Sequence, residues 1–411
     1  MIVQLALGFR SLLIFHAVAE NFSIGRAAQA VGLSQPAISL TIKKLEAVTG
    51  RKLLRRGTKG SEVTVDGALL LRRTARMLHQ IELGIAQILN LDLSSRVVQA
   101  ACRRLTDTQI RTHIALMNST SATQAAISLG VSQVAVHRAG QDIEHVIGTP
   151  LYRRTGSRLV VNSAGAELGR RLQLALSEIS QALDELQSSP AQLKGRVRVG
   201  VLPLSPQHLL ADVLSRMTHL YPYANITIHE DDYLKLQTDL RYGKIDMIIG
   251  ALRVPRVGLD LREFELFLDP YEIVVRKNHP LAEKAGITAS DILQYKWVVP
   301  PQNTPRHQIS RSLFEQLEKR PPQVVETNSL AMIIALLQAS DFITILSRTQ
   351  VYQSGLTRNL VPLAFKLPDA DRVIGLVSRA EWLPTELQKL FINDVKTWVR
   401  LQHRGSDKVI R

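Results

Sequence analysis

Residues 27–39 read AAQAVGLSQPAIS, and residues 125–137 read AAISLGVSQVAVH. The two stretches share paired alanines, a glycine and a Ser-Gln pair at equivalent positions, 98 residues apart. At this offset the alignment runs without a gap from about residue 12 to residue 186, and it also matches Arg55 and Arg56 with Arg153 and Arg154. Solenoid repeats have much shorter periods. The pattern therefore indicates a tandem duplication of a whole domain.

The chain length and the cysteine count predict a multidomain protein of the reducing cytoplasm. A chain of 411 residues exceeds the size at which one hydrophobic core keeps growing, so two to four domains are expected. The single cysteine, Cys102, can form neither an internal disulfide nor a thiolate metal cluster. The apolar start ends in Ala17-Val18-Ala19 like a signal peptide, but Arg10 splits it and residues 110–117 occupy the equivalent place in the second copy. We therefore expect a domain's first helix there, and a soluble protein.

Positive charge is concentrated toward the N-terminus. The net charge is +15, and residues 1–188 carry 22 Lys and Arg against 13 Asp and Glu. This half is more basic per residue than the remainder, as a region that binds a polyanion would be.

The first copy has the pattern of a winged helix-turn-helix. Residues 11–19 and 23–31 are predicted helices, Gly32 breaks the second, and Ser34 is a natural N-cap for a third helix over residues 35–49. This layout places its last helix in the DNA major groove. After Gly50, KLLRR and SEVTVDG alternate like two strands joined by GTKG, which predicts a small wing.

Each copy then continues into a long predicted helix. Apolar residues fall at 71, 75, 78, 81, 85 and 88, and again at 168, 172, 176, 179, 183 and 186. Such a 3-4 alternation makes a seam that packs on another helix. Packing of each helix on its own domain is the alternative. SSPAQLKG, residues 188–195, reads as a polar linker.

The motif as a whole resembles the DNA-binding domain of LysR-type transcriptional regulators. The resemblance is carried by Ala27-Ala28, the run from Ser34 to Ser39, Leu45-Glu46, Gly50, Leu53, Arg55-Arg56 and Thr64-Val65-Asp66-Gly67. It implies that the long helix pairs with a counterpart to dimerise the DNA-binding domains. It also implies that Gln35 contacts a base edge, that Ser34 and Ser39 contact phosphate or bases, and that Arg55 and Thr64 contact phosphates. The residues of the first copy expected to contact DNA are Ser23, Ser34, Gln35, Pro36, Ser39, Lys43, Arg55, Arg56 and Thr64.

The second copy departs from this pattern on its reading surface. Pro36 becomes Val134, Ser39 becomes His137, Ile42 becomes Gly140 and Lys43 becomes Gln141. The residues expected to contact DNA in this copy are Ser132, Gln133, His137, Arg153 and Arg154. Phosphate docking is thus kept better than base reading, and we expect a weaker or differently specific reader. A purely structural relic is the alternative.

The C-terminal half alternates strands with helices, which predicts parallel α/β sheets. It resembles the family's effector-binding domain, two α/β lobes related in fold to periplasmic ligand-binding proteins, and within it the subgroup that contains the regulator of a galactose-binding protein. Ligands in such sheets bind at the carboxyl ends of strands and at helix N-termini. The candidate effector-binding residues are Leu204, Ser205, Arg253, Gln302, Asn303, Thr304, Asn328 and Ser329, and an ordinary helix cap is the alternative for each.

Enzyme chemistry has no candidate group. A Gly-rich phosphate loop, HExxH, a nucleophile elbow and a CxxC pair are all absent from the sequence. The run HEDD, residues 229–232, suggests a metal site, but consecutive strand residues alternate faces, so a solvated strand end is the expected reading. We expect no catalytic residue, no metal and no cofactor.

The sequence thus predicts a multidomain chain: two winged helix-turn-helix domains with long linker helices, then a two-lobed α/β effector domain of the periplasmic-binding-protein type. The expected boundaries are 1–67 and 68–95 for the first copy and its linker helix, 96–165 and 166–190 for the second, and 195–403 for the effector domain. Lobe one is expected over 196–266 and 365–403, and lobe two over 267–364.

The expected function is a sequence-specific DNA-binding transcriptional regulator controlled by a small molecule bound between the lobes. Expected partners are double-stranded DNA, a small-molecule effector such as a sugar or organic acid, RNA polymerase, and further copies of the chain in a homo-oligomer, with no membrane. One alternative is a cytoplasmic ligand-binding protein whose repeats serve oligomerisation. Another is a transferase or hydrolase built on the α/β half.

Overall fold

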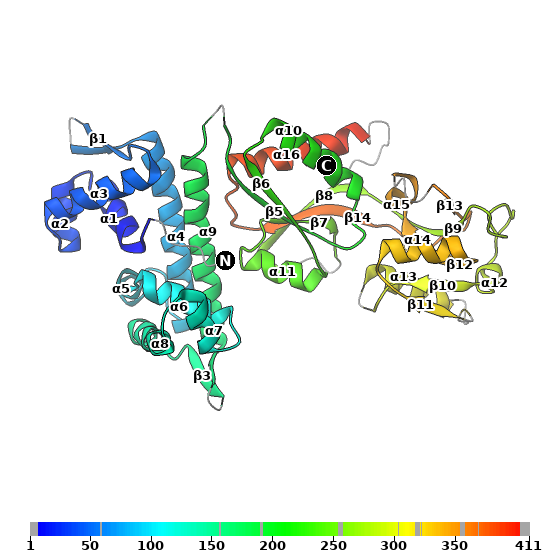
Figure 1. Ribbon diagram of the computed structural model, residues 1–411, viewed down its shortest axis with the longest axis horizontal. Coiled ribbons are helices and arrows are strands. Elements are labelled where there is room, and N and C mark those ends of the chain that lie inside the picture. Colours follow the sequence, from blue (N-terminus) through cyan, green and yellow to red (C-terminus); the bar gives the residue numbers. More distant parts are fainter. Residues whose placement is uncertain are drawn as a thin grey trace. The chain divides into compact units, whose positions relative to one another are not determined.

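The structure is a computed structural model that divides into two compact units, residues 1–196 with 241–243, and residues 197–240 with 244–411. Figure 1 shows the elements of each unit. The residues described are 7–57, 60–155, 158–189, 192–253, 258–302, 304–316, 321, 323–353, 358–368 and 370–402.

The first copy folds into the predicted helices and hairpin. Ser23 and Ser34 each accept a hydrogen bond at 3.4 Å from a backbone N–H in the first turn of the helix that follows. Gly32 and Gly50 end the second and third helices at φ 67° and 66°, a left-handed conformation that glycine adopts without strain. The elements are α1 (Phe9–Asn21), α2 (Ile24–Val31), α3 (Gln35–Thr49), β1 (Leu54–Gly57), β2 (Gly60–Val63) and α4 (Val65–Leu89).

The second copy repeats this order of elements. Ser121 and Ser132 cap α7 and α8 as their equivalents Ser23 and Ser34 cap α2 and α3. One further helix, α5, precedes this copy and contacts α4 and α8. The elements are α5 (Arg96–Arg104), α6 (Asp107–Met117), α7 (Ala122–Leu129), α8 (Gln133–Ile147), β3 (Tyr152–Thr155), β4 (Arg158–Val161) and α9 (Ser163–Leu186).

Both long helices begin earlier than predicted. We expected a strand over residues 61–67 and a helix from 68, but β2 ends at Val63 and the Thr64 hydroxyl caps α4 by accepting from the Gly67 N–H at 3.0 Å. A Cβ on Gly67 would lie 2.1 Å from the Leu53 carbonyl oxygen, so only glycine allows this close approach. Asn162 and Gly165 make the same arrangement before α9. The linker helices therefore start at residues 65 and 163.

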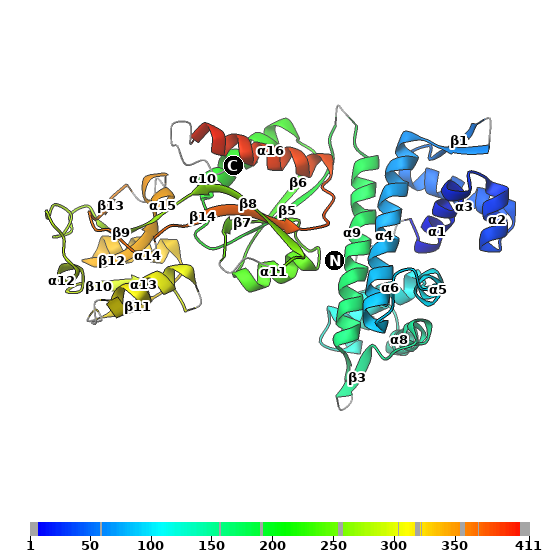
Figure 2. The ribbon, with the colours of Figure 1, turned by 180° about the vertical axis from the view of Figure 1, so that it is seen from behind.

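Helices α4 and α9 lie side by side, and the two wings lie at opposite ends of the pair (Figures 1 and 2). The predicted seam of α9 is buried at Leu168, Leu172, Leu176, Ile179 and Leu186, whereas Leu183 is half-buried. The predicted seam of α4 was wrong in its first two turns. Its buried stripe runs through Leu70, Arg73, Thr74 and Met77, and two of these side chains are polar and lie outside the apolar seam that we predicted.

A cluster of charged and amide side chains joins α4 to α9. The Arg73 side chain is 0% exposed, and its guanidinium donates to Glu178 and Glu185 at 2.8 Å and to Gln181 at 3.0 Å. Arg76 donates to the other oxygen of Glu178 at 2.9 Å. Further along the pair, Arg171 of α9 donates to Gln80 of α4 at 3.0 Å. Early residues of one helix thus contact late residues of the other, so the helices are antiparallel.

The two copies have different cores under the wing. In the second copy the buried His113 imidazole lies 2.7 Å from the Tyr152 hydroxyl and 2.8 Å from the Gly165 carbonyl oxygen. Gly140 leaves room for the Tyr152 ring, which a Cβ at that glycine would meet at 3.4 Å. The equivalents in the first copy are Phe15, Ile42 and Leu54. Gly140 thus occurs together with a larger side chain, Tyr152, in the place of Leu54. Burial lowers the pKa of His113 to about 4.

The C-terminal unit consists of two lobes. The strand order is β6-β5-β7-β14-β8 in lobe one and β11-β10-β12-β9-β13 in lobe two. Apolar residues of α10 and α16 cover one face of the first sheet and those of α11 the other, while α13 and α14 cover opposite faces of the second. The lobe-one elements are β5 (Gly195–Val201), α10 (Gln207–Leu220), β6 (Ala224–Glu230), α11 (Tyr233–Arg241), β7 (Met247–Ala251), β8 (Leu261–Leu268), β14 (Val373–Arg379) and α16 (Glu386–Gln402).

Lobe two is inserted between β8 and β14. Its elements are β9 (Tyr271–Arg276), α12 (Ala289–Ile292), β10 (Lys296–Val299), α13 (Pro305–Gln316), β11 (Val324–Glu326), α14 (Leu330–Ala339), β12 (Phe342–Ser347), α15 (Arg348–Gln353) and β13 (Leu360–Pro362). The sheets are mixed, not parallel throughout: β14 runs antiparallel to β7 and β8, and β9 antiparallel to β12 and β13. The strands next to the insertion account for the antiparallel pairs, because β8 and β9 lead from lobe one into lobe two whereas β14 leads back into lobe one.

The crossings between the lobes lie later than predicted. Phe267 is buried in the core of lobe one, so the first crossing follows β8 at Asp269 and Pro270. Leu363 and Leu367 pack in the core of lobe two, so the second crossing lies near Arg372 and not near Ala364. The two crossings are joined by backbone hydrogen bonds, one of which runs from the Asp269 N–H to the Arg372 carbonyl at 2.7 Å. A pair of adjacent segments therefore connects the lobes.

The buried His113 predicts an acid sensitivity of the second copy. Its pKa is about 4 in the folded chain against 6.5 for an ordinary histidine. The unfolded state takes up the proton first, so this contribution to stability is complete above pH 6.5 and is lost as the pH falls toward 4, by about 3 kcal/mol. We expect the protection of α6 and α8 amides from hydrogen exchange, corrected for intrinsic rates, to fall over this range.

The double variant His113→Phe with Tyr152→Phe should show a smaller fall than the original protein, because it removes the titrating group and its hydroxyl partner together. His145→Gln, at an exposed position of α8, is the matched control and should change nothing. An identical fall in the double variant would contradict this account.

Candidate DNA interface and effector cleft

The DNA-facing candidates of the first copy gather at the start and along one side of α3. Gln35, Pro36 and Lys43 are exposed, and Ser39 is half-buried. Ser34 immediately precedes the helix and caps it. A helix N-terminus with an exposed amide and a lysine two turns later can offer hydrogen bonds to a base edge and to phosphates.

The candidate DNA-binding residues at the wing of the first copy also form contacts within the protein. Arg55 is exposed and forms an ion pair with Glu62 at 3.1 Å, and Arg56 is exposed. The Thr64 hydroxyl donates to the Lys52 carbonyl at 2.6 Å while it caps α4. Ser23 caps α2. The structural roles of Ser23 and Thr64 are thus observed, and their contacts with DNA stay predictions.

The second copy presents a less cationic surface at the equivalent places. Gln133 and Arg153 are exposed, and Ser132 caps α8. His137 is half-buried, and the side chain of Arg154 lies outside the described residues. Lys43 and Lys44 of the first copy are replaced by Gln141 and Asp142, while Val134 is 77% exposed at the start of α8. An exposed apolar side chain there can contact a thymine methyl group but not a phosphate.

A cleft of about 710 Å³ lies in the C-terminal unit. Residues 202–204, 232–234, 251 and 253 line it from lobe one, residues 300–302, 304–306 and 328 from lobe two, and Tyr271 and Arg372 from the crossings. Of the predicted effector residues, Leu204, Arg253, Gln302, Thr304 and Asn328 line this cleft. Ser205 is buried and donates to the Ile249 carbonyl, Ser329 caps α14, and Asn303 lies outside the described residues.

Three arginines line the cleft together. Burial lowers the pKa of Arg306 to about 10, with a further contribution from the nearby positive charge of Arg372. Arg372 stacks over the ring of Tyr271 at 5.3 Å and donates to the Leu204 carbonyl at 3.1 Å. Arg253 stacks over Tyr233 at 4.8 Å, and burial lowers its pKa. Leu204 has φ 64°, a strained backbone conformation, and its carbonyl accepts from Arg372 and from the Gln350 side chain.

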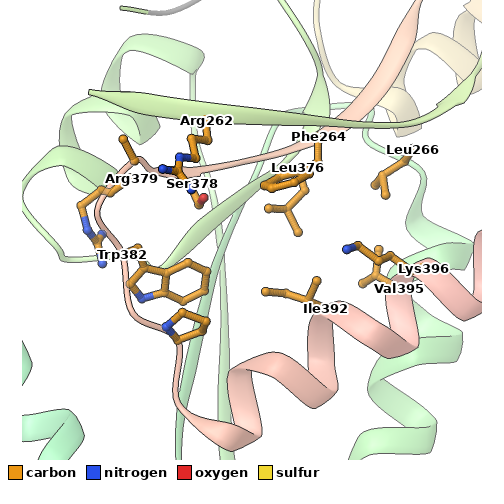
Figure 3. A pocket seen from close by; sticks show the side chains of 12 residues that line it. Arg262, Phe264, Leu266, Leu376, Ser378, Arg379, Trp382, Ile392, Val395 and Lys396 are labelled. Atoms are coloured by element: carbon orange, nitrogen blue, oxygen red, sulfur yellow. The ribbon is translucent and has the colours of Figure 1, made fainter. Parts of the chain in front are cut away.

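A second cavity, of about 200 Å³, lies within lobe one (Figure 3). Its walls come from β8, β14 and α16 and are largely apolar, with Phe264, Leu376, Trp382 and Ile392 among them. Lys396 lies over the Phe264 ring at 5.5 Å. Effector sites combine an apolar lining with a few convergent polar groups. The interlobe cleft fits this description better, because its arginines come from both lobes and from a crossing.

Among the described residues, no three His, Cys, Asp or Glu side chains are placed to hold a metal ion. His229, Glu230, Asp231 and Asp232 are all exposed at the end of β6. No helix in the described part of the chain has the length and apolarity that crossing a membrane requires.

The sequence matches two profiles of one family. Residues 190–400 match the LysR substrate binding domain, and residues 9–68 and 108–166 each match the bacterial regulatory helix-turn-helix protein of the lysR family. The chain therefore belongs to the LysR family of transcriptional regulators, proteins that combine a DNA-binding helix-turn-helix with an effector-binding domain. Membership fits a regulator and not an enzyme.

Individual relatives support the same assignment. The chain is 29% identical over 367 residues to the HTH-type transcriptional regulator GalR of Pseudomonas putida, covering 89% of this chain and 91% of that protein. It is 26% identical over 265 residues to the regulator GbpR of Azospirillum brasilense, covering 63% and 77%. A full-length OxyR variant from Pseudomonas aeruginosa superposes with a TM-score of 0.54 at 21% identity, over 72% of this chain and 95% of that one, which shows a shared fold.

Sequence reasoning missed Arg306, Arg372 and Tyr271. Arg306 lies one residue inside α13, and Arg372 and Tyr271 lie at the lobe crossings, whose positions we predicted several residues too early. A weak signal was present, since Arg306 follows the Pro-Gln-Asn-Thr-Pro run that we expected to open a helix beside a ligand.

The exposed position of Gln35 at the start of α3 generates a test of base reading. Gln35→Ala should lower discrimination between a specific and a random DNA site by about 1–3 kcal/mol, because a base-edge contact is lost. Arg55→Ala should weaken both kinds of site about equally, since phosphate contacts carry no sequence information. Competition binding at fixed salt measures both. Unchanged discrimination in Gln35→Ala would reject the assignment, and Gln133→Ala is the matched variant in the second copy.

Proposed function

We propose that one chain of this regulator carries two DNA-docking winged helices, held as a pair by α4 and α9. The observation that carries the proposal is the contact of the buried Arg73 with Glu178 and Glu185 across the two helices. The resemblance to the family implies that the linker helices of two subunits pair with each other. Here the second linker helix comes from the same polypeptide, so the chain is a pseudo-dimer.

The charges at this contact differ between the copies. Arg73 and Arg171 are equivalent at the offset of 98 residues, but the acids that face Arg73 on α9, Glu178 and Glu185, are equivalent to Gln80 and Gln87 on α4. On the opposite helix Arg73 therefore faces two carboxylates, whereas Arg171 faces the neutral Gln80 and pairs with Glu167 of its own helix. The acids that neutralise the buried arginine of α4 are supplied by α9.

This asymmetry favours α4 with α9 over α4 with the α4 of another chain. In an α4–α4 pair of the same register, each Arg73 would face Gln80 and Gln87 and would be buried without a carboxylate. Leaving a buried charge unpaired costs about 3–5 kcal/mol. The charge pattern thus selects the unlike pair, which also sets the wings of the two copies at opposite ends of one helix pair.

The two winged helices divide the work of DNA binding. The first copy, residues 1–64, reads sequence through Gln35 and its neighbours and docks on phosphates through Arg55 and Arg56. The second copy, residues 96–162, docks mainly through Gln133 and the Arg153-Arg154 pair, because Gln141 and Asp142 remove positive charge from its helix. A homo-oligomer of such chains would present more than two winged helices and occupy an extended site.

The effector domain, residues 195–402, supplies the control. A small molecule that binds the cleft contacts both lobes and the crossings, and therefore stabilises one arrangement of the lobes over others. That shift is transmitted to the DNA-binding pair and to RNA polymerase. A footprint measured with and without effector tests this step, and an identical footprint under saturating effector would reject it.

The Arg73 cluster predicts a specific pattern of damage and rescue. Glu178→Gln with Glu185→Gln should destabilise the N-terminal unit by about 3–5 kcal/mol, because Arg73 is left buried without an acid. Adding Arg73→Met should restore most of the loss, since an apolar side chain of similar length needs no carboxylate. Amide hydrogen exchange along α4 and α9 measures both. Failure of the third substitution to rescue would show that the cluster does not act through charge pairing.

Docking of the second copy predicts a change in salt dependence. Arg153→Ala with Arg154→Ala should reduce the slope of log affinity against log salt by up to about 1.8, since each phosphate contact contributes about 0.9. It should also shorten the footprint. Arg104→Ala, at an exposed position of α5, is the control for lost positive charge outside the winged helix. If slope and footprint stay unaltered, the second copy is a spacer that serves assembly.

A further inference from the structure

Arg306 is a buried cation without a carboxylate partner. Its residue is 4% exposed, and Nη1 donates one long hydrogen bond, at 3.3 Å, to the Ile345 carbonyl. Among the described residues, no Asp or Glu oxygen lies within 4 Å of its guanidinium. A buried charge of this kind is stable only when something supplies the opposite charge.

The neighbouring arginines add to the excess of positive charge. Arg372 is 8% exposed, and its Nε has no hydrogen-bond partner. Its nearest acid, Asp269, lies at 3.8 Å and uses one carboxylate oxygen to accept from the Thr349 N–H. The Nε of Arg253 likewise has no partner. Both nitrogen atoms are buried, and no group in the described part of the chain accepts a hydrogen bond from them.

The acids around the cleft do not balance these charges. Asp232 is the acidic residue among those that line it, and one of its oxygens accepts from the Lys235 N–H at the start of α11. Three arginines thus meet the exposed carboxylate of Asp232 and the buried one of Asp269, and the cleft keeps a net positive charge. Arginine side chains bind carboxylate and phosphate groups through two parallel N–H bonds.

We propose that the effector is a small organic oxyanion whose acidic group lies between Arg306 and Arg372, with Arg253 closing on it from lobe one. The inference rests on the proposed effector role of the cleft and adds the chemical class of its ligand. The anion supplies the charge that Arg306 lacks. Because Arg306 belongs to lobe two, Arg253 to lobe one and Arg372 to a crossing, one acidic group links all three parts.

The remaining lining describes the body of the ligand. The cleft of about 710 Å³ is larger than an inorganic anion requires. Leu202, Leu234 and the rings of Tyr233 and Tyr271 offer apolar contact, and Gln302, Thr304 and Asn328 offer neutral hydrogen bonds. The ligand is therefore an acid with a compact, partly apolar body, and neutral sugars lack the group that the arginines require.

Thermal unfolding of the full-length protein tests the ligand class. The probes are citrate, benzoate, glucose 6-phosphate and inorganic phosphate, each titrated at constant ionic strength against sodium chloride. Their neutral counterparts are benzamide and galactose. We expect at least one organic acid to raise the melting temperature in a saturable way, and the neutral compounds to leave it unchanged. Comparison of the carboxylates with the phosphates identifies which acidic group the cleft prefers.

Arg306→Gln locates the binding. It should abolish the anion-induced shift while leaving the ligand-free melting temperature equal to that of the original protein or higher, because an uncompensated buried charge is removed. A merely structural arginine would instead lower it. Arg311→Gln is the matched control on the same helix, since that side chain is 69% exposed and pairs with Glu315. Arg253→Gln, at a half-buried position, should weaken anion binding, and it replaces Arg306→Gln as the test variant if that protein does not fold.

Two results would overturn the proposal: stabilisation by galactose or benzamide but not by any acid, and an anion-induced shift of equal size in Arg306→Gln and the original protein. Either would leave the proposed regulation by a cleft ligand intact. Conversely, anion binding that requires Arg306 but does not alter the DNA footprint would support the ligand class and count against the effector role.

Discussion

The arrangement of the N-terminal unit depends on one buried guanidinium. Arg73 is fully enclosed between α4 and α9, and the two carboxylates that it needs stand on the opposite helix. The helices can therefore pack only in an order that brings Glu178 and Glu185 to Arg73. Each helix is continuous with the wing before it, so the same contact fixes where both winged helices stand within the unit. Arg51 strengthens this link by donating to the carbonyls of Leu186 and Ser188 at the end of α9.

Buried ion pairs are weak contributors to net stability but effective determinants of pairing, because the mismatched alternative leaves a charge unpaired. Arg73 and Arg171 occupy equivalent positions at the offset of 98 residues, but Gln80 and Gln87 of α4 stand where α9 has Glu178 and Glu185, so the two helices are unlike. The cores diverged in the same complementary manner, since Gly140 makes room for Tyr152, whose hydroxyl pairs with His113. The second copy thus has the same order of elements as the first but differs from it in its core and in the exposed residues of the helix that follows its turn.

Much of the fold follows from local sequence signals. Serine caps, left-handed glycines and helical periodicity predicted α1–α3 and α6–α8, because these features act within a few residues. Features that depend on distant partners were missed. Arg73 was not part of the predicted seam, since the acids that it contacts lie more than 100 positions away, and Thr64 was placed in a strand although it caps a helix. Arg372 reaches the cleft, where Arg306 of α13 also lies, because the second crossing follows residues 363–367, which pack in lobe two.

The central claim is that α4 and α9 of one chain pair with each other. In a background with Cys102→Ser, the substitutions Gly84→Cys and Arg171→Cys place two thiols across this contact, since a Cβ on Gly84 would lie 3.0 Å from the Arg171 Cβ. Mild oxidation followed by non-reducing electrophoresis, over a range of protein concentrations, reads out the pairing. The account predicts an internal disulfide that runs as a monomer at every concentration. Disulfide-linked dimers that increase with concentration, or no disulfide at all, would contradict it.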